Sequence, residues 1–413
     1  MLANLNPLPK EVYLGIPNSA YIHIPFCRRR CYYCDFPVYV VGDKLQGDKS
    51  RTISDYVEIL CQEIAITSNL GQPLETIFFG GGTPSLLSVN QLADILEVLK
   101  GRFDISQTAE ISMEIDPGTF TREQLQGYLA AGVNRISLGV QTFVPQLLKV
   151  CGRSHTIDDI WSAFDLIAQA QVKNFSLDLI SGLPHQTIEQ WQANLETAIT
   201  VSPNHISIYD LTIEAGTAFG RYYQPGDNPL PTDDDTVEMY RLARQILTQA
   251  GYEHYEISNY AQPGYQCRHN RVYWKNRPYY GFGMGAASYT HGQRFTRPRK
   301  SKEYYEWVQD FIAAKGVLNC PPTPPDEVLL DTLMLGLRLA EGINLSTLAA
   351  FGEETLERIW TCLQPYYQKG WVEVVGTVFD GIPRQGRLRL SDPEGFLFSN
   401  VVLADLFSRL GVD

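Results

Sequence analysis

The sequence lacks the features that would direct it to nucleic acid, into a membrane or out of the cell. Positive charge is scarce: 34 Lys and Arg stand against 46 Asp and Glu, a net charge of −12, which disfavours a general binder of nucleic acid or anionic membranes. No run of about eighteen apolar residues is present, so no segment is predicted to span a bilayer. The first ten residues lack the basic segment and apolar stretch of a secretory signal. We therefore expect a cytoplasmic protein with at most peripheral membrane contact.

Cysteine is sparse except in one short segment. Five of the eight cysteines are scattered singly over 413 residues and are typical of small buried hydrophobes in a reducing compartment. The other three, Cys27, Cys31 and Cys34, follow a C-x3-C-x2-C spacing. Three thiolates on one loop can hold three irons of a cubic [4Fe–4S] cluster and leave the fourth iron to a small molecule. Such a cluster can pass an electron directly into its bound ligand.

A structural zinc site is the competing prediction for the same cysteines. Zinc takes four N or S ligands in a tetrahedron. His23, four residues before Cys27, would complete an H-x3-C-x3-C-x2-C pattern. The spacing alone leaves both possibilities open.

Short apolar strands alternate with amphipathic helices from about residue 20 to residue 212. This alternation predicts parallel βαβ units and an α/β fold, a partial (β/α)6 TIM-like barrel. The carboxyl ends of the strands then carry the ligand site, and the cysteine loop, Gly80–Gly82 and Asp116 all follow strands directly. The predicted strands are 21–24, 76–79, 111–115, 135–140, 174–180 and 205–211, and helices are predicted at 157–170, at 191–199 and after capping boxes at Thr121 and Thr187.

A proline-rich segment at residues 317–326 predicts a linker between two domains. We expect residues 1–315 to form the barrel domain with flanking elements and residues 326–413 to form a small α+β winged-helix-like domain. Helices at 327–340 and 354–367 precede strands at 371–375 and 387–390. This second part holds seven Lys and Arg against thirteen Asp and Glu, which argues against DNA binding and favours a lid or docking surface.

Five motifs surround the predicted ligand site: residues 21–34, Gly80-Gly-Gly-Thr-Pro-Ser85, Glu114-Ile-Asp-Pro117, Gly139-Val-Gln-Thr-Phe143 and Asp178-Leu-Ile-Ser-Gly-Leu-Pro184. Together they resemble the oxygen-independent coproporphyrinogen III oxidase family of radical S-adenosylmethionine (SAM) enzymes, from about residue 20 to the C-terminus. The resemblance favours a cluster over zinc, with Cys27, Cys31 and Cys34 as its ligands. It implies that SAM binds the open iron and that the reduced cluster cleaves it to a 5′-deoxyadenosyl radical. The implied SAM contacts are Tyr21, Tyr33, Gly81, Gly82, Thr83, Glu114, Gln141, Arg153 and Asp178.

The residue types fit these implied contacts. Glycines without side chains let the backbone approach SAM closely, Glu114 suits ribose hydroxyls or an amino group, and Arg153 can pair with a carboxylate through two nitrogens. Simpler alternatives exist: a tight turn for the glycine run, a solvated carboxylate for Glu114, and packing for Tyr21 and Tyr33.

Two features separate the chain from the oxidase. The oxidase carries a fourth cysteine two residues after the third, where this chain has Phe36, and it has a longer N-terminal extension. His269-Asn-Arg-Val-Tyr-Trp274 resembles the HNxxYW signature of the haem chaperone branch, HemW. This implies a protein that binds haem, retains the cluster and SAM, and delivers haem to respiratory apoproteins. The alternative is a radical SAM enzyme that decarboxylates a porphyrinogen, so enzymatic activity stays an open question.

Haem contact is predicted for His269. Imidazole is a common haem-iron ligand, Tyr273 and Trp274 offer flat apolar faces, and Cys267 is a possible thiolate ligand. The alternative is a histidine hydrogen-bonded within an aromatic-rich loop. Basic clusters at residues 28–30 and 294–302 suit haem propionates or an acidic electron donor such as flavodoxin or ferredoxin, unless they are only solvated faces.

Overall fold

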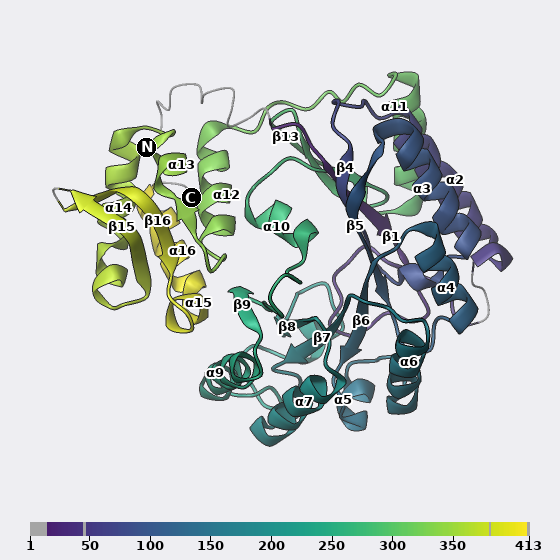
Figure 1. Ribbon diagram of the computed structural model, residues 1–413, viewed down its shortest axis with the longest axis horizontal. Helices are drawn as coiled ribbons and strands as arrows, with labels where there is room; N and C mark the ends of the chain where they lie inside the picture. The colour runs from purple at the N-terminus through teal and green to yellow at the C-terminus, as the bar shows by residue number, and fades with distance from the viewer. Residues whose placement is uncertain (1–14, 44–46, 380, 411–413) are drawn as a thin grey trace.

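The computed structural model describes residues 15–43, 47–379 and 381–410. Its main sheet has nine strands in the order β11-β1-β4-β5-β6-β7-β8-β10-β9 (Figure 1). Six parallel strands run in chain order through it and confirm the predicted α/β fold: β1 (Ser19–Ile24), β4 (Leu74–Gly81), β5 (Ile105–Ile115), β6 (Arg135–Gln141), β7 (Phe175–Ser181) and β8 (His205–Asp210).

No helix in these described ranges is long and apolar enough to cross a membrane. Residues 1–14, which bear on the predicted lack of a secretory signal, lie outside the described residues.

Helices cover the outer side of the parallel strands, where alternate residues such as Ile22, Ile77 and Leu138 are fully buried (Figure 1). Predicted capping boxes begin two of these helices: Thr121 and Thr187 each accept the backbone N–H three residues on. A cap of this kind contributes about 1 kcal/mol. The covering helices are α2 (Arg51–Ile66), α3 (Val89–Phe103), α4 (Arg122–Ala131), α5 (Pro145–Val150), α6 (Ile157–Gln169), α7 (Ile188–Val201) and α9 (Asp233–Gln249).

The inner face of the strands is polar, unlike that of most barrels. Glu114, Ser137 and Asp178 point inward from β5, β6 and β7 and line a cavity. Their neighbours Met113, Leu138 and Leu177 point to the helices. The alternation along each strand therefore places the polar residues together inside the barrel.

Three short strands of the sheet were not predicted. β9 (Glu253–Glu256) and β10 (Asn259–Ala261) extend the β8 edge antiparallel, and β11 (Tyr280–Phe282) pairs in parallel with β1. Glu63 supports β11, because it accepts the N–H of Gly283 at 2.9 Å and pairs with Arg297 at 2.5 Å while fully buried. Such contacts depend on residues more than 200 positions apart and leave no local pattern in the sequence.

A helix replaces the aromatic-rich loop expected around residue 269. The carboxylate of Glu110 accepts the N–H groups of Arg268 at 3.2 Å and His269 at 3.1 Å, which starts the helix α10 (Arg268–Trp274). A carboxylate at this position satisfies donors that have no partner within the helix. α10 lies between the sheet and the C-terminal elements (Figure 1) and closes the amino ends of the strands, since it contacts β4 and β5 there.

The C-terminal elements have the order of a winged helix: a helix, a short strand, two helices and a hairpin. They surround a core of their own that includes Leu333, Ile359, Leu363 and Leu406. The elements are α12 (Pro325–Gly336), β14 (Ile343–Asn344), α13 (Leu345–Ala349), α14 (Glu353–Gln368), β15 (Val372–Phe379), β16 (Ile382–Leu390), α15 (Glu394–Leu397) and α16 (Ser399–Leu410). The remaining elements are β2 (Phe26–Cys27), β3 (Tyr39–Val40), η1 (Gly47–Lys49), η2 (Pro84–Leu86), α8 (Phe219–Tyr222), β12 (Ala287–Thr290), β13 (Gln293–Thr296) and α11 (Ser301–Ala313).

Glu341 ties α10 to the C-terminal sheet. Its carboxylate lies 2.8 Å from Arg271, 3.3 Å from Lys275 and 3.8 Å from Arg387.

We expect Glu341→Ala to lower the free energy of unfolding by about 1 kcal/mol, because these ion pairs are partly solvated. Urea denaturation measures this change. Glu353→Ala is the control, because Glu353 is a more exposed partner of an arginine within the C-terminal elements. It should lower the free energy of unfolding less. An equal loss would contradict a stabilising contact between α10 and the C-terminal sheet at Glu341.

Candidate functional site

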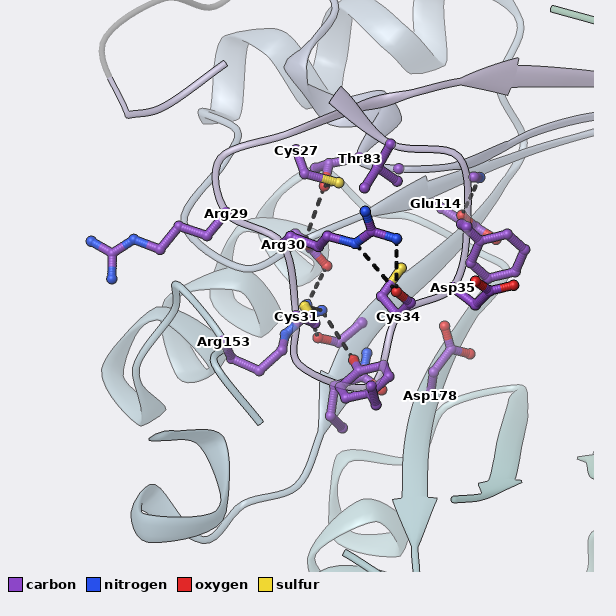
Figure 2. Close-up of a pocket in the computed structure, with 18 of the residues that line it drawn as sticks. Cys27, Arg29, Arg30, Cys31, Cys34, Asp35, Thr83, Glu114, Arg153 and Asp178 are labelled. Atoms are coloured by element: carbon purple, nitrogen blue, oxygen red, sulfur yellow. Dashed lines mark hydrogen bonds and ion pairs between the residues drawn. The ribbon is translucent and has the colours of Figure 1, made fainter. Parts of the chain in front are cut away.

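The carboxyl ends of the parallel strands surround a cavity of about 630 Å³, within the range of about 300–1,000 Å³ typical of ligand sites. The loop after β1 and residues from β4 to β8 all contribute to its wall (Figure 2). The cysteine loop, the glycine run and Asp116 therefore meet at one rim, as the sequence predicts.

Backbone hydrogen bonds hold the cysteine loop on both sides. β2 pairs with β3, and Cys27 accepts the N–H of Val41 at 2.9 Å. Thr83 donates its N–H to Phe26 at 2.7 Å, which joins the loop to the end of β4. In this arrangement Cys27, Cys31 and Cys34 are free thiols that line the cavity (Figure 2).

The zinc alternative does not fit this geometry. His23, its predicted fourth ligand, has both ring nitrogens engaged, 3.0 Å from Tyr21 Oη and 3.0 Å from the Pro37 carbonyl. Within the described ranges no three His, Cys, Asp or Glu side chains converge on a point where one ion would sit. Three free thiols that line one cavity can each bind one iron of a group with several irons.

Arg153 and Asp116 form a buried pair beside the thiols. One guanidinium nitrogen of Arg153 lies 2.6 Å from Asp116, and the other donates to Cys31 Sγ at 3.2 Å. The two side chains are only 8% and 22% exposed. The Arg153 cation offsets negative charge at Cys31, whereas the Asp116 carboxylate of the same pair adds negative charge beside Cys27. The sequence predicts that Arg153 is available to a carboxylate of SAM, whereas its two terminal nitrogens contact Cys31 and Asp116 in the structure.

Burial, and secondarily the charge of Asp116, raises the pKa of the Cys27 thiol to about 12. Without metal this sulfur is protonated at neutral pH, and binding iron must release the proton. Burial also raises the pKa of Cys34.

The carboxylate of Glu114 lies beside the glycine run, and that of Asp178 lines the cavity from β7. Glu114 accepts the N–H of Gly81 at 3.0 Å, and Asp178 accepts from Ser137 at 3.2 Å. A side chain at Gly82 would approach the Phe26 carbonyl to 2.7 Å, so only glycine fits between β4 and the cysteine loop. Burial and the nearby Asp178 raise the pKa of Glu114 to about 8, and burial raises the pKa of Asp178.

Gln141 reaches the cavity because β6 ends irregularly. The register of β6 against β7 shifts before Gln141, which adopts a φ of 67°, a left-handed conformation that is uncommon for non-glycine residues. Eight of the predicted SAM contacts line the cavity: Tyr33, Gly81, Gly82, Thr83, Glu114, Gln141, Arg153 and Asp178.

Tyr21 and His269 are not among the lining residues. The hydroxyl of Tyr21 contacts His23, and its ring stacks on Phe78, which corresponds to the packing alternative. His269 is fully buried, with Nδ1 2.7 Å from Thr76 Oγ1 and Nε2 2.8 Å from Tyr273 Oη.

Burial lowers the pKa of His269 to about 3, so the imidazole is neutral. Because both of its nitrogens are bonded, the geometry favours the alternative of a hydrogen-bonded histidine over an iron ligand. Cys267 is also buried, and its thiol lies 3.7 Å from Glu110. The motif around residue 269 therefore attaches α10 to β4 and β5 through hydrogen bonds to Thr76 and Glu110.

Comparison with known proteins adds two findings. The family model described as "Radical SAM superfamily" matches residues 21–198. A Synechocystis protein named "Heme chaperone HemW" is 46% identical over 408 residues, which is 96% of this chain and 98% of the relative. The Bacillus subtilis protein of the same name is 36% identical, covering 86% of this chain and 92% of its own.

Among solved structures, coproporphyrinogen III oxidase (HemN) from Escherichia coli, a radical SAM enzyme, is similar with a TM-score of 0.77 and 22% identity. The match covers 95% of this chain and 90% of that one. This similarity establishes a shared fold.

Proposed function

Because this chain belongs to the HemW family of the radical SAM superfamily, we propose that it is a haem chaperone. It binds haem together with a SAM-ligated [4Fe–4S] cluster and delivers haem to respiratory apoproteins. The observation that carries the proposal is the 46% identity that extends over nearly the whole chain of a haem chaperone.

The cavity residues support the cofactor part of the proposal. Cys27, Cys31 and Cys34 hold the cluster, and Arg153 stabilises their charge through Cys31. The cluster, when bound, supplies an electron to SAM. The polar wall binds and orients SAM through Tyr33, Gly81, Gly82, Thr83, Glu114, Gln141 and Asp178. Tyr21 lies outside this wall and stacks on Phe78.

A second candidate function is oxidative decarboxylation of a porphyrinogen by a radical SAM enzyme. The complete polar wall around the thiols favours it, since this wall suits SAM. Phe36 disfavours it, because the oxidases resembled by this sequence have their fourth cysteine at that position.

One experiment separates the two functions. Anaerobically reconstituted protein is incubated with SAM and haemin, and separately with SAM, reductant and coproporphyrinogen III. A chaperone should give a Soret band with haemin and leave the porphyrinogen unchanged. Decarboxylated product with matching 5′-deoxyadenosine, and no Soret band, would overturn the proposal.

We further propose a cytoplasmic location, with flavodoxin or ferredoxin as electron donor. In this proposal residues 1–315 and 326–413 form two domains, and the second serves as a lid or docking surface. Its excess of acidic residues disfavours nucleic acid as the partner.

The affinity for SAM should rise with pH in a way that depends on Glu114. Because the pKa of this buried carboxyl is about 8 rather than 4.5, it becomes negative, and attracts the SAM cation, only as the pH rises through about 8. In the unfolded chain this carboxyl ionises near pH 4.5, whereas in the folded protein it ionises near pH 8. The free energy of unfolding of the protein without SAM therefore falls as the pH rises from about 4.5 to about 8.

Equilibrium dialysis of SAM across this pH range tests the dependence on Glu114. Glu114→Gln should flatten the rise, while Glu123→Gln, on the exposed first turn of α4, should preserve it. A rise that persists in Glu114→Gln would assign the effect to another group.

A further inference from the structure

One part of the cavity wall is apolar and lies outside the set of predicted SAM contacts. Phe36 and Tyr209 line the cavity although 59% and 49% of their surfaces are exposed. Pro37 and Val38 continue the wall after Phe36, and Leu211 continues it after Tyr209. We name these five residues the outer wall. Exposed aromatic rings at a cavity mouth leave apolar surface that a flat apolar ligand can cover.

Two arginines adjoin the outer wall. Arg30 donates to the carbonyl of Cys34 at 3.2 Å, and Arg299 donates to the carbonyl of Asp35 at 2.6 Å. These carbonyls belong to the two residues directly before Phe36, so both guanidinium groups are bonded to the loop segment that leads into the outer wall. Arg299 also lies 3.5 Å from the Asp35 carboxylate, but both side chains are more than half exposed, and such pairs are weak.

We propose that haem docks on the outer wall, with its ring on Phe36 and Tyr209 and its propionates at Arg30 and Arg299. The inference rests on the proposed function and assigns its haem site. The pairing of apolar surface with two cations, on a protein with a net charge of −12, is complementary to a flat apolar ring with two carboxylates. The bonded, fully buried nitrogens of His269 leave no iron ligand at the motif.

An acidic protein would also be attracted by arginines, but the structure favours a small ligand. Both arginines line the same cavity as the outer wall, in which Leu211 is only partly exposed. A docking protein would need a broad exposed surface, typically about 800 Å² on each partner.

Haemin titration of the full chain, loaded with cluster and SAM, tests the site. The double variant Arg30→Gln/Arg299→Gln should weaken haem binding at least about tenfold, as expected when charge-assisted bonds are lost. Arg51→Gln is the control: Arg51 begins α2, is 94% exposed and does not line the cavity, so its removal should change the affinity less than about twofold. Equal weakening by both would indicate a general charge effect and overturn the inference.

The apolar contact is tested in the same way. Phe36→Ser should weaken binding by about tenfold, whereas Tyr39→Ser should not, because Tyr39 is similarly exposed but does not line the cavity. With haemin dimethyl ester, which lacks the propionate charges, the arginine variants should equal wild type and Phe36→Ser should remain weak.

His269→Gln distinguishes the outer wall from the motif. Glutamine can keep polar contacts with Thr76, so the fold should persist and haem affinity should stay within about twofold of wild type. If this variant loses the Soret band while the outer-wall variants bind haem normally, haem binds at the motif. That result would overturn this inference but not the proposed function. Wild-type protein that binds no haemin would overturn the proposed function itself.

Discussion

Single replacement of Cys27, Cys31 or Cys34 by serine is expected to abolish the cluster. Iron should fall from about four atoms per reconstituted chain to nearly none, and SAM binding should fall with it. A serine hydroxyl is a poor iron ligand at neutral pH, and two remaining thiolates on one loop would leave half the cluster without protein ligands. Iron analysis and the broad visible absorbance of anaerobic samples measure the effect.

Cys61→Ser and Cys320→Ser are the controls. Both thiols are partly exposed, as the three loop cysteines are, but neither lines the cavity. These variants should keep wild-type iron and absorbance. Retention of the full cluster in any of the three loop variants would contradict the ligand assignment.

Arg153→Met should destabilise the protein by about 3 kcal/mol, because it leaves the Asp116 carboxylate largely buried without its counter-charge. The pair has a 2.6 Å contact and connects the end of β5 to the loop between α5 and α6. Urea denaturation of the metal-free protein gives the change in unfolding free energy. The same variant should also load less iron, since its contact with Cys31 is lost.

The double variant Arg153→Met/Asp116→Asn separates charge from packing. Removing both charges should recover at least half of the lost stability, because no isolated buried charge remains. A double variant less stable than Arg153→Met would show that the arginine acts through packing and that the ion pair is not coupled.

The sequence predicts what depends on local patterns. Alternating apolar residues locate the six parallel strands, and the position of a motif after a strand locates the cysteine loop, the glycine run and Glu114. The pairing of Arg153 with Asp116 does not follow from a local pattern. The two residues are 37 positions apart, and their contact depends on how two strands and a later loop assemble. A polar residue two positions after Glu114 on the same strand face was the available signal for Asp116.

Long-range burial also explains the result at His269. Its sequence neighbours are aromatic and polar, which suits a ligand site and a buried helix equally. Only β4, nearly 200 residues earlier, supplies the Thr76 hydroxyl that occupies Nδ1. For the same reason β11 escapes prediction, because three residues carry too little periodicity and their partner strand lies near the start of the chain.

The helix that carries His269 also acts as the floor of the barrel, because it covers the amino ends of β4 and β5 while the thiols open at the opposite end. Above this floor lie Glu110, Arg135 and Ser112, buried polar groups for which water would compete. A substitution that loosens the helix would let solvent enter beneath the cofactors. Impaired haem transfer in such a variant would then result from water entering the barrel. A measurement of protein stability on the same sample would distinguish this cause from the loss of a haem ligand.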